Sequence, residues 1–524
     1  MNTSLWKKLE LLILVVYASA FYLLIIRRSL QIAHDYSMDL KGLRAGWISN
    51  RLNDFSDAQW RNFRGNLPIL TIVLGIFTLI ANTLRFFFQL KSREMAIIWF
   101  CLSLIYLIYL HGACIVFIFF IVSINFLVVK AFANSKYFSS ALWIFNLSIL
   151  LCNRIFEGYL FSSIGKNLSF LDNYRGTFRW HICFNFVVLR MISFGYDYHW
   201  SCNISHFDQE KHTQRCSICS SGKTCYLLLQ ERELYFDGYS FMTYLCYLIY
   251  APLYISGPII SFNAFASQLH VPQKNHSPSQ VLLYGFKWIA CLILMEVMTH
   301  FFYYNAFATS GMWKKLSPFD IFIIGYGVLN FMWLKFLLIW RYFRLWSLIG
   351  GIESPENMPR CINNCYDLES FWKSWHASFN KWLVRYIYIP LGGYKQKMLN
   401  VWVIFTFVAI WHDLEWKLVS WAWLTCLFMI PEIIIKSTFT AFKSRNTYWK
   451  FALRELKALV GAVTITSLMV TNLVGYVIGF SNIRQFLSQF YKEDGLAVPC
   501  GIFATFYVGT KLMFHVQEAK QKYH

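Results

Sequence analysis

Two histidines in the second half of the chain, His376 and His412, are the side chains best suited to acid–base chemistry. Each directly follows a tryptophan and lies near a strongly apolar stretch, where an ionisable side chain is costly and by default marks function. Histidine has an ordinary pKa near 6.5, so a neutral imidazole can accept a proton at physiological pH. One such histidine would more often cap a helix or touch lipid headgroups. Two of them indicate a proton-transfer site.

The segment that positions His376 is predicted to be helical from Phe371 to Gly393. Its aromatic residues recur at helical spacing and form a stripe of Trp372, Trp375, Phe379 and Trp382. Asn380 follows His376 by four residues and therefore shares its helix face. Pro390 and the two glycines after Leu391 are expected to end the helix. The segment is too polar to span a membrane freely and too aromatic for water, so we expect it to line a cavity.

The amino-acid composition indicates that this protein lies in a membrane. Of its 524 residues, 57% are hydrophobic, 19% are aromatic and 14% are charged, whereas soluble domains carry about 25% charged residues. Soluble, disordered and fibrous classes are therefore excluded. The net charge is 48 − 27 = +21. In a membrane protein this charge fits loops that face anionic headgroups or a polyanionic substrate, and no nucleic-acid partner is expected.

We predict an all-α, polytopic membrane protein of about ten to twelve transmembrane helices, with re-entrant or interfacial helices around a central catalytic chamber. The apolar candidates are residues 11–26, 67–90, 95–110, 113–129, 139–156, 180–194, 240–262, 281–302, 320–340, 399–411, 418–435, 459–480 and 498–514. Residues 1–524 are treated as a single domain. Within it we distinguish an amphipathic segment at about 39–65, a polar loop at about 197–238 and a catalytic core at about 350–415.

The polar loop holds a concentration of residues that can bind metals: His206, His212, Cys216, Cys219 and Cys225. Two histidines and three thiols are able to bind zinc, but one CxxC without a second spaced pair indicates a zinc site only weakly. Ordinary thiols and palmitoylated cysteines are the alternatives. The sequence therefore assigns no metal ligand. Most of the other cysteines lie within apolar runs, which is typical of buried small hydrophobic residues.

The last five residues, Lys520-Gln-Lys-Tyr-His524, resemble a dilysine retrieval signal, with lysines three and five places from the end. Such a signal predicts a multi-pass protein of the endoplasmic reticulum membrane with a cytosolic C-terminus.

The block from Phe371 to Gly393, followed by Trp411-His412, resembles the membrane-bound O-acyltransferase family. Residues 54–64, 250–262 and 472–476 are similar to the glycerol-uptake (Gup) branch, and residues 250–262 also to the Hedgehog-acyltransferase branch. The resemblance implies transfer of a long fatty acyl group from acyl-CoA, the co-substrate, to a hydroxyl group. It implies that His412 is the catalytic base, assisted by His376 and Asn380. A serine or cysteine nucleophile motif is absent from the sequence, in agreement with direct attack by the acceptor.

The resemblance also bears on the substrates. The pair Trp375-His376 is as in Gup-like proteins and differs from the acidic arrangement of Hedgehog acyltransferase. It therefore implies a lipid or glycolipid acceptor, as in remodelling of glycosylphosphatidylinositol (GPI) anchors, over a protein-linked one. Trp375 and Trp382 suit an acyl chain. Lys373, Lys381 and Arg385 suit either coenzyme A phosphates or lipid headgroups.

Cys361 stands in the context Met358-Pro-Arg-Cys361, which is similar to a haem-ligating cysteine context in the Hedgehog-acyltransferase relative. Thiolate ligation of haem iron is chemically reasonable, and a structural cysteine is the alternative.

Three other functions remain open from the sequence. A glycerol transporter or transport regulator would favour buried acidic residues in several helices, for which the candidates are Glu157, Glu296 and Asp320. A protein N- or O-acyltransferase would use the same chemistry on another acceptor. A non-catalytic acyl-binding protein is disfavoured because both His376 and His412 are present.

Overall fold

The computed structural model describes residues 3–48, 50–202, 207–232, 234, 236–273, 275–441, 447–475, 488 and 497–522. These residues are helical almost throughout, and one short hairpin is the only sheet among them. The predicted all-α class of polytopic membrane protein is confirmed. Tyr523 and His524, at the end of the dilysine-like tail, and His206 of the polar loop lie outside the described residues.

The first half of the chain contains the hairpin and the longest run of apolar helices. Its elements are α1 (Thr3–Tyr36), β1 (Leu43–Ala45), β2 (Leu52–Asp54), α2 (Ala58–Phe88), α3 (Ser92–His111), α4 (Ile115–Phe132), α5 (Phe138–Ile155), α6 (Trp180–Ser201), α7 (Gln209–Arg215), α8 (Ser217–Ser220), α9 (Tyr226–Glu231), α10 (Phe241–Ile249), α11 (Ala251–Tyr254) and α12 (Phe262–His270).

The second half alternates long helices with short, broken ones. Its elements are α13 (Pro278–Phe301), α14 (Tyr304–Ser310), α15 (Pro318–Ile349), α16 (Leu368–Ser374), α17 (Ala377–Leu383), the π-helical turn η8 (Val384–Tyr388), α18 (Lys397–His412), α19 (Trp416–Ala441), α20 (Thr447–Leu473) and α22 (Ala497–Lys522).

Nine helical stretches among the described residues are long and apolar enough to cross a membrane. One of them, Ser92–Phe132, contains both α3 and α4. Three predicted spans, residues 180–194, 240–262 and 399–411, are not among the nine. They correspond to α6, to the broken pair α10–α11 and to α18, which contribute to the largest cluster of buried residues instead.

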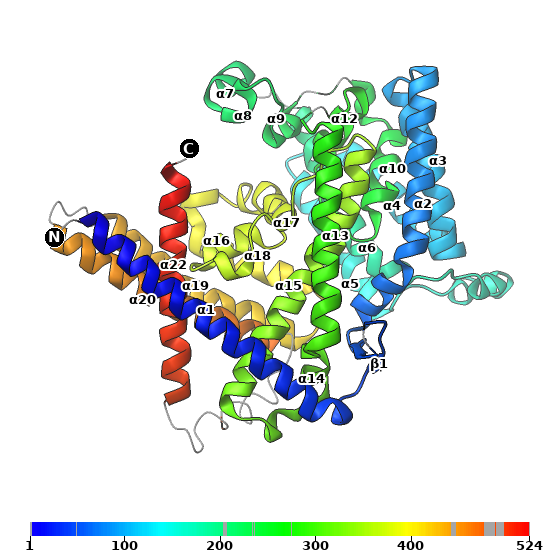
Figure 1. The fold of residues 1–524 in the computed structure, drawn as a ribbon. Coiled ribbons are helices and arrows are strands. Elements are labelled where there is room, and N and C mark those ends of the chain that lie inside the picture. Colours follow the sequence, from blue (N-terminus) through cyan, green and yellow to red (C-terminus); the bar gives the residue numbers. More distant parts are fainter. Residues whose placement is uncertain are drawn as a thin grey trace.

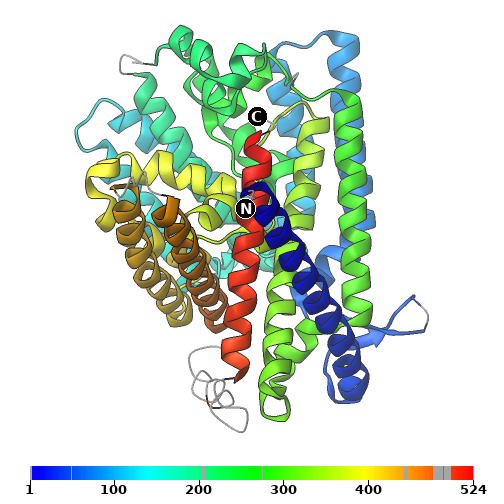
Figure 2. The same ribbon diagram turned by 60° about the vertical axis from the view of Figure 1, so that its left-hand side comes forward.

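The short helices α16, α17 and α18 lie between two groups of long helices (Figure 1). On one side α13 packs on α15, and α15 also contacts α2. On the other side α18 packs on α19, α19 on α20, and α20 on α22 (Figure 2). The N-terminal helix α1 crosses α22, so the first and last described helices pack together on the outside of this second group. The catalytic core predicted at 350–415 is therefore enclosed by the long helices.

The predicted amphipathic segment at 39–65 is not one element. Its first part is the antiparallel hairpin β1–β2, in which Leu43 pairs with Asp54 and Ala45 with Leu52. Its second part is the beginning of α2. The buried carboxylate of Asp54 accepts a hydrogen bond from the backbone N–H of Ala306 at 2.8 Å, which ties the hairpin to α14. Residues 39–57 thus serve as a packed corner between α1 and α2.

Several charged side chains within the apolar helices are paired with one another. Lys335 of α15 donates to Asp57 at 2.8 Å, and the Lys335 side chain is only 6% exposed. Arg28 of α1 donates to Asp320 of α15 at 2.7 Å. Arg64 of α2 is paired with Glu296 of α13. Ionisable groups at membrane depth are expected to pair in this way, because an unpaired charge there is costly.

The pair of Lys335 and Asp57 gives a stability prediction. Lys335→Met leaves the Asp57 carboxylate without its cation, and Asp57→Asn leaves a buried ammonium while still capping α2. Each single change should lower the free energy of unfolding by about 3 kcal/mol, the scale for a buried ion pair that loses one partner. The double variant removes both charges and should recover most of that loss. Thermal unfolding of the detergent-solubilised protein measures this, and strictly additive losses would contradict the pairing.

Candidate active site

The helix predicted to run from Phe371 to Gly393 is broken at His376, and the prediction of one continuous helix is wrong. Helix α16 ends at Ser374 and α17 begins at Ala377. Between them His376 has φ 47° and ψ 50°, in the left-handed region. A non-glycine residue in this region costs about 1–2 kcal/mol and persists only where its surroundings hold it. His376 therefore does not project from the face of a regular helix.

Asn357 holds this break in place. Its backbone carbonyl accepts from the N–H of Ala377 at 3.0 Å, and its side-chain oxygen accepts from the N–H of Ser378 at 3.0 Å. These are the first N–H groups of α17, which have no partner within their own helix. The segment before α16 thus replaces the missing helical hydrogen bonds, and this compensates for the conformation of His376.

Aromatic rings enclose the imidazole of His376, which is 7% exposed. The ring of Trp340 from α15 lies 4.3 Å away between centroids, and that of Phe379 lies 5.3 Å away. The Nδ1 atom is buried and has no hydrogen-bond partner among the described residues. Buried polar atoms are nearly always paired, so this unpaired nitrogen is an exception.

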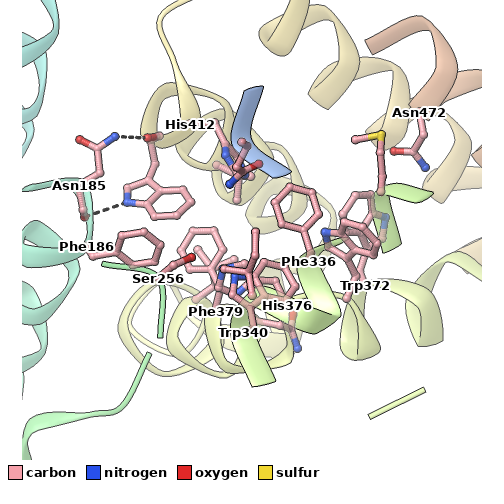
Figure 3. Close-up of a pocket in the computed structure, with 18 of the residues that line it drawn as sticks. Asn185, Phe186, Ser256, Phe336, Trp340, Trp372, His376, Phe379, His412 and Asn472 are labelled. Carbon is pink, nitrogen blue, oxygen red and sulfur yellow. Dashed lines mark hydrogen bonds between the residues drawn. The ribbon is translucent and has the colours of Figure 1, made fainter. Parts of the chain in front are cut away.

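His412 is the last residue of α18, and its position is fixed through Trp411. The side-chain amide of Asn185 on α6 donates to the Trp411 carbonyl at 2.9 Å, and the Trp411 indole N–H donates to the Asn185 carbonyl at 2.9 Å (Figure 3). The Trp411 ring packs on Phe379 with 4.6 Å between centroids. The end of α18 is therefore bound to both α6 and α17.

His376 and His412 line the same cavity, whose volume is about 1480 Å³. In Figure 3 the two side chains come toward the same space from different segments. Typical small-ligand pockets measure about 300–1,000 Å³, so this cavity has room for more than one substrate. Its wall is mostly aromatic and aliphatic, with polar side chains at intervals: Gln59, Asn62, Asn66, Asn185, Ser256, Asn330, Asn363, Asn380 and Asn472.

The electrostatics of the cavity keep both histidines neutral. His412 is open to the cavity but enclosed by protein, and this desolvation lowers its pKa to about 4. Burial also lowers the pKa of His376 well below its ordinary value, and a positive charge on His412 lowers it further. A neutral imidazole can accept a proton, so both side chains are bases at physiological pH.

The structure places the predicted site residues in two groups. His376, Asn380, His412, Trp375 and Lys373 line the cavity together. Trp382, Lys381 and Arg385 do not line it and have other partners. The Trp382 indole donates to Ser193 at 2.8 Å, the Lys381 ammonium lies 5.2 Å from the centre of the Tyr226 ring, and Arg385 is paired with Asp197 and Glu231. Their predicted contact with substrate stays a prediction.

Cys361 lies in the loop before α16 and is partly buried. Its neighbours Ile362 and Asn363 line the cavity, whereas Cys361 does not. The Cys361 thiol is therefore beside the wall of this cavity and not part of it. Ligation of haem by Cys361 therefore stays a prediction, and the acyl-transfer chemistry does not depend on it.

Reasoning from sequence missed the side chains that position the two histidines. Asn185 lies in an apolar run, and its polarity there was a usable signal. Asn357 gave no signal, because it acts through the backbone of residues twenty positions away. Lys397 at the start of α18 lines the cavity and lies 4.0 Å from Glu369, which Lys373 also contacts at 2.7 Å.

Comparison with known proteins agrees with this geometry. The profile of the membrane-bound O-acyltransferase (MBOAT) family matches residues 132–475, which include both histidines and most of the cavity wall. The chain belongs to the membrane-bound O-acyltransferase family. It is therefore a multi-pass membrane protein with acyltransferase activity, which acts on an acyl donor.

Its relatives lie in the Gup branch of the MBOAT family. The chain is 35% identical to membrane-bound O-acyltransferase gup1 of Schizosaccharomyces pombe, over 91% of this chain and 82% of that protein. It is 33% identical to membrane-bound O-acyltransferase GUP1 of Saccharomyces cerevisiae, over 99% of this chain and 93% of that protein. The mouse protein-cysteine N-palmitoyltransferase HHAT is 26% identical over 45% of this chain and 50% of its own length. The predicted Gup-like branch is confirmed.

The hydrogen bond from Asn185 to Trp411 predicts a positioning role in this MBOAT enzyme. Asn185→Leu removes the side-chain donor and lets the end of α18 shift, so kcat should fall about 10-fold or more, in line with the cost of misplaced catalytic groups. KM for the acyl donor should change little. Kinetics in reconstituted vesicles measure both constants.

Asn125→Leu is the matched control. Asn125 is a buried asparagine that accepts from Asn146 and donates to Tyr244, away from the cavity. It should lower stability about as much as Asn185→Leu but leave kcat near the wild-type value. Equal losses of kcat in the two variants would contradict the role of Asn185.

Proposed function

We propose that this protein transfers a long-chain fatty acyl group from acyl-CoA to a hydroxyl of a lipid or glycolipid, with His412 as the general base. The observation that supports this most strongly is that His412 and His376, both neutral, line one large apolar cavity. Such a cavity accommodates an acyl chain and keeps water from the thioester. The names of the Gup-branch relatives describe O-acyltransferases, which supports a hydroxyl group as the acceptor.

In the proposed reaction His412 removes the proton from the acceptor hydroxyl as its oxygen attacks the thioester carbonyl carbon. The carbon–sulfur bond then breaks and the coenzyme A thiolate leaves. The proton on His412 returns to that sulfur, so the products are an ester and free coenzyme A thiol. His376 and Asn380, on the same cavity wall, orient the acceptor or polarise the carbonyl.

The coenzyme A phosphates are proposed to bind where Lys373 and Lys397 meet at the cavity wall. These two cations share one carboxylate, that of Glu369, at 2.7 and 4.0 Å. Lys436 also lies 3.7 Å from Glu369, but Asp367 and Glu432 neutralise it at 2.6 and 2.9 Å. Lys373 and Lys397 thus leave positive charge at the wall, which phosphate oxygens are suited to balance.

The acceptor is proposed to be a membrane lipid, with the lipid of a GPI anchor as the first candidate. An acceptor with its own acyl or alkyl chains reaches an apolar cavity within the helices directly from the bilayer. The proposed location is the endoplasmic reticulum membrane with a cytosolic C-terminus, on the basis of Lys520 and Lys522 in the tail. Haem stays a prediction only, since Cys361 does not line the cavity.

Transport of glycerol receives no support from the acidic residues. Glu296 is held by Arg64 and by the indole N–H of Trp47 at 2.9 Å, and Asp320 is held by Arg28. Neither carboxylate lines the cavity, and neither does Glu157. Coupled transport would need carboxylates on the substrate path, whereas these three lie off the cavity wall, and Glu296 and Asp320 join helices to each other.

The proposed base is tested by His412→Ala. Loss of general-base catalysis typically costs 10²–10⁴-fold, so transfer from labelled acyl-CoA to membrane lipids should fall at least about 100-fold. His111→Gln is the control, because His111 is a buried histidine that does not itself line the cavity and whose ring nitrogens are both bonded, to Phe178 and Tyr254. It should keep near wild-type transfer.

Normal transfer by a folded His412→Ala variant would reject the mechanism. Chromatography of the labelled products separates free lipid, GPI lipid and protein acceptors. Label that appears only on protein would reject the proposed acceptor class while leaving the role of His412 intact.

The lowered pKa of His412 predicts the pH dependence of transfer. A base acts in its neutral form, so activity is lost as the pH falls through the pKa of the histidine in the folded enzyme. Because desolvation lowers that pKa to about 4, kcat should stay level from pH 8 to below pH 6 and decline only under more acidic conditions. An acid limb centred at pH 6.5 or above, the range of an exposed histidine, would contradict the desolvated site.

A further inference from the structure

A second cluster of reactive side chains lies far from the cavity, in the polar loop between α6 and α10. His212, Cys216, Cys219 and Cys225 each offer one ligand atom, and these four atoms all lie within 4.8 Å of one another. The Nε2 atom of His212 is 3.1 Å from the Cys225 sulfur and 3.6 Å from the Cys219 sulfur. In tetrahedral zinc sites with these ligand types the donor atoms lie about 3.5–3.8 Å apart. Only small shifts of the four side chains would therefore bring their donor atoms to the spacing of a zinc site.

The local chain is folded so that these donors converge. His212 lies in the last turn of α7, and the N–H of Cys216 donates to its carbonyl at 2.9 Å. Cys219 follows in α8. A turn at Gly222, where φ is +78°, then brings the chain back to Cys225. The Cys225 sulfur accepts from the N–H of Leu228 at 3.3 Å, and such N–H to sulfur bonds orient and stabilise thiolate ligands.

The hydrophobic effect does not account for the order of this loop. Helix α7 has seven residues, none of them buried, and α8 has four residues, of which only Cys219 is buried. Helices this short are not stable in water without tertiary support. They lie at one end of the molecule, outside the long helices (Figure 1). His212 of α7 and Cys219 of α8 meet Cys216, which lies between the two helices, and Cys225, which precedes α9, so a bound metal would supply the missing stabilisation.

The alternatives fit the geometry less well. Palmitoylation needs an accessible thiol, whereas Cys219 and Cys225 are 5% and 8% exposed. All three cysteines are free thiols, and a disulfide between any two of them would leave the third thiol and His212 facing it without a role. Thiolate and imidazole ligands in a closed set of four select zinc and leave no open position for a substrate.

We propose that His212, Cys216, Cys219 and Cys225 bind one structural Zn²⁺ ion. Binding releases the three thiol protons to solvent and keeps His212 neutral, so the site carries +2 − 3 = −1, counting the four ligands. Lys211, Arg215 and Lys223 stand beside the ligands in the sequence and offset this charge. The site is independent of acyl transfer chemistry.

The zinc site would connect the loop to the walls of the acyltransferase core. Directly before Cys225, the N–H and C=O of Thr224 bond to the side chain of Asn275 at 3.0 and 2.7 Å. Directly after it, α9 packs on α12, and Glu231 at its end is paired with Arg385 beside α17. A metal at Cys225 therefore anchors the segment that holds Arg385, although its four ligands lie outside the cavity.

The test uses the full-length protein purified in detergent without added metal or chelator. Elemental analysis should find about one zinc per chain, as for a four-ligand structural site. Cys219→Ser and His212→Ala should lose it, whereas Cys202→Ser, an exposed cysteine at the end of α6, should retain it. Zinc below one tenth per chain in the wild type, or equal zinc in Cys219→Ser, would overturn the proposal.

A second measurement covers the case in which the variants do not accumulate. Wild-type protein stripped by a chelator and reloaded with Co²⁺ should gain a thiolate-to-cobalt charge-transfer band. Stripping should also make residues 207–232 sensitive to protease while the long helices stay resistant. Absence of the band, or a mass spectrum with acyl groups on Cys216, Cys219 or Cys225, would exclude the zinc site.

Discussion

The break of the helix at His376 is the constraint on which the active site depends. A continuous helix through this region would direct the side chains of residues 376 and 380 to one face, and α16 and α17 would share one axis. Instead the left-handed backbone at His376 turns the chain, and Asn357 supplies the hydrogen bonds that the break removes. In an apolar surrounding every backbone donor must find a partner. The break is therefore possible only where a second segment such as residues 354–358 lies alongside.

The same constraint explains the rest of the enclosure. Trp411 must reach Phe379 and His376 across the cavity wall, and it does so because Asn185 of α6 satisfies its backbone carbonyl and its indole at once. The C-terminal half of α18 is largely buried, and the helix ends at the cavity with His412. The long helices α13, α15, α19 and α20 surround the short helices α16, α17 and α18. Without them, the unpaired backbone groups at the ends of the short helices would face lipid.

The helix class and most spans could be predicted from the sequence because these depend on composition and local pattern, and the two predicted histidines do line one cavity. Prediction failed where the pattern is ambiguous. Residues 240–262 are apolar enough to span, but the chain bends at Tyr250 and Pro252, and α10, α11 and the following loop pack inside the protein. Burial in protein and burial in lipid select the same residue types, so hydropathy alone does not distinguish them. The hairpin at 43–54 was missed because strands of three residues carry too little periodicity.

Within the site, local spacing placed Asn380, Trp375 and Lys373 correctly on the cavity wall but not Lys381 or Arg385. Arg385 is held away from the cavity wall by its ion-pair partners. Arg385 lies beside two carboxylates, Asp197 and Glu231, that are more than 150 residues away in the chain. A long-range ion pair of this kind leaves no trace in the spacing of the residues themselves. The positions of Asn185 and Asn357 are equally non-local, and only the folded chain identifies them.

A comparison of the buried histidines shows which features distinguish a structural histidine from a candidate catalytic one. His111 has partners for both ring nitrogens, Phe178 and Tyr254, and so has a purely structural environment. His300 has an unpartnered Nε2, as His376 has an unpartnered Nδ1. An unsatisfied nitrogen is therefore not sufficient. His300 packs against Trp47 beside the hairpin and does not line the cavity, whereas His376 does and has His412 close enough to influence its charge. The combination of an unpaired nitrogen, a shared cavity and a second neutral imidazole is what supports the proposed proton-transfer role of His376 and His412.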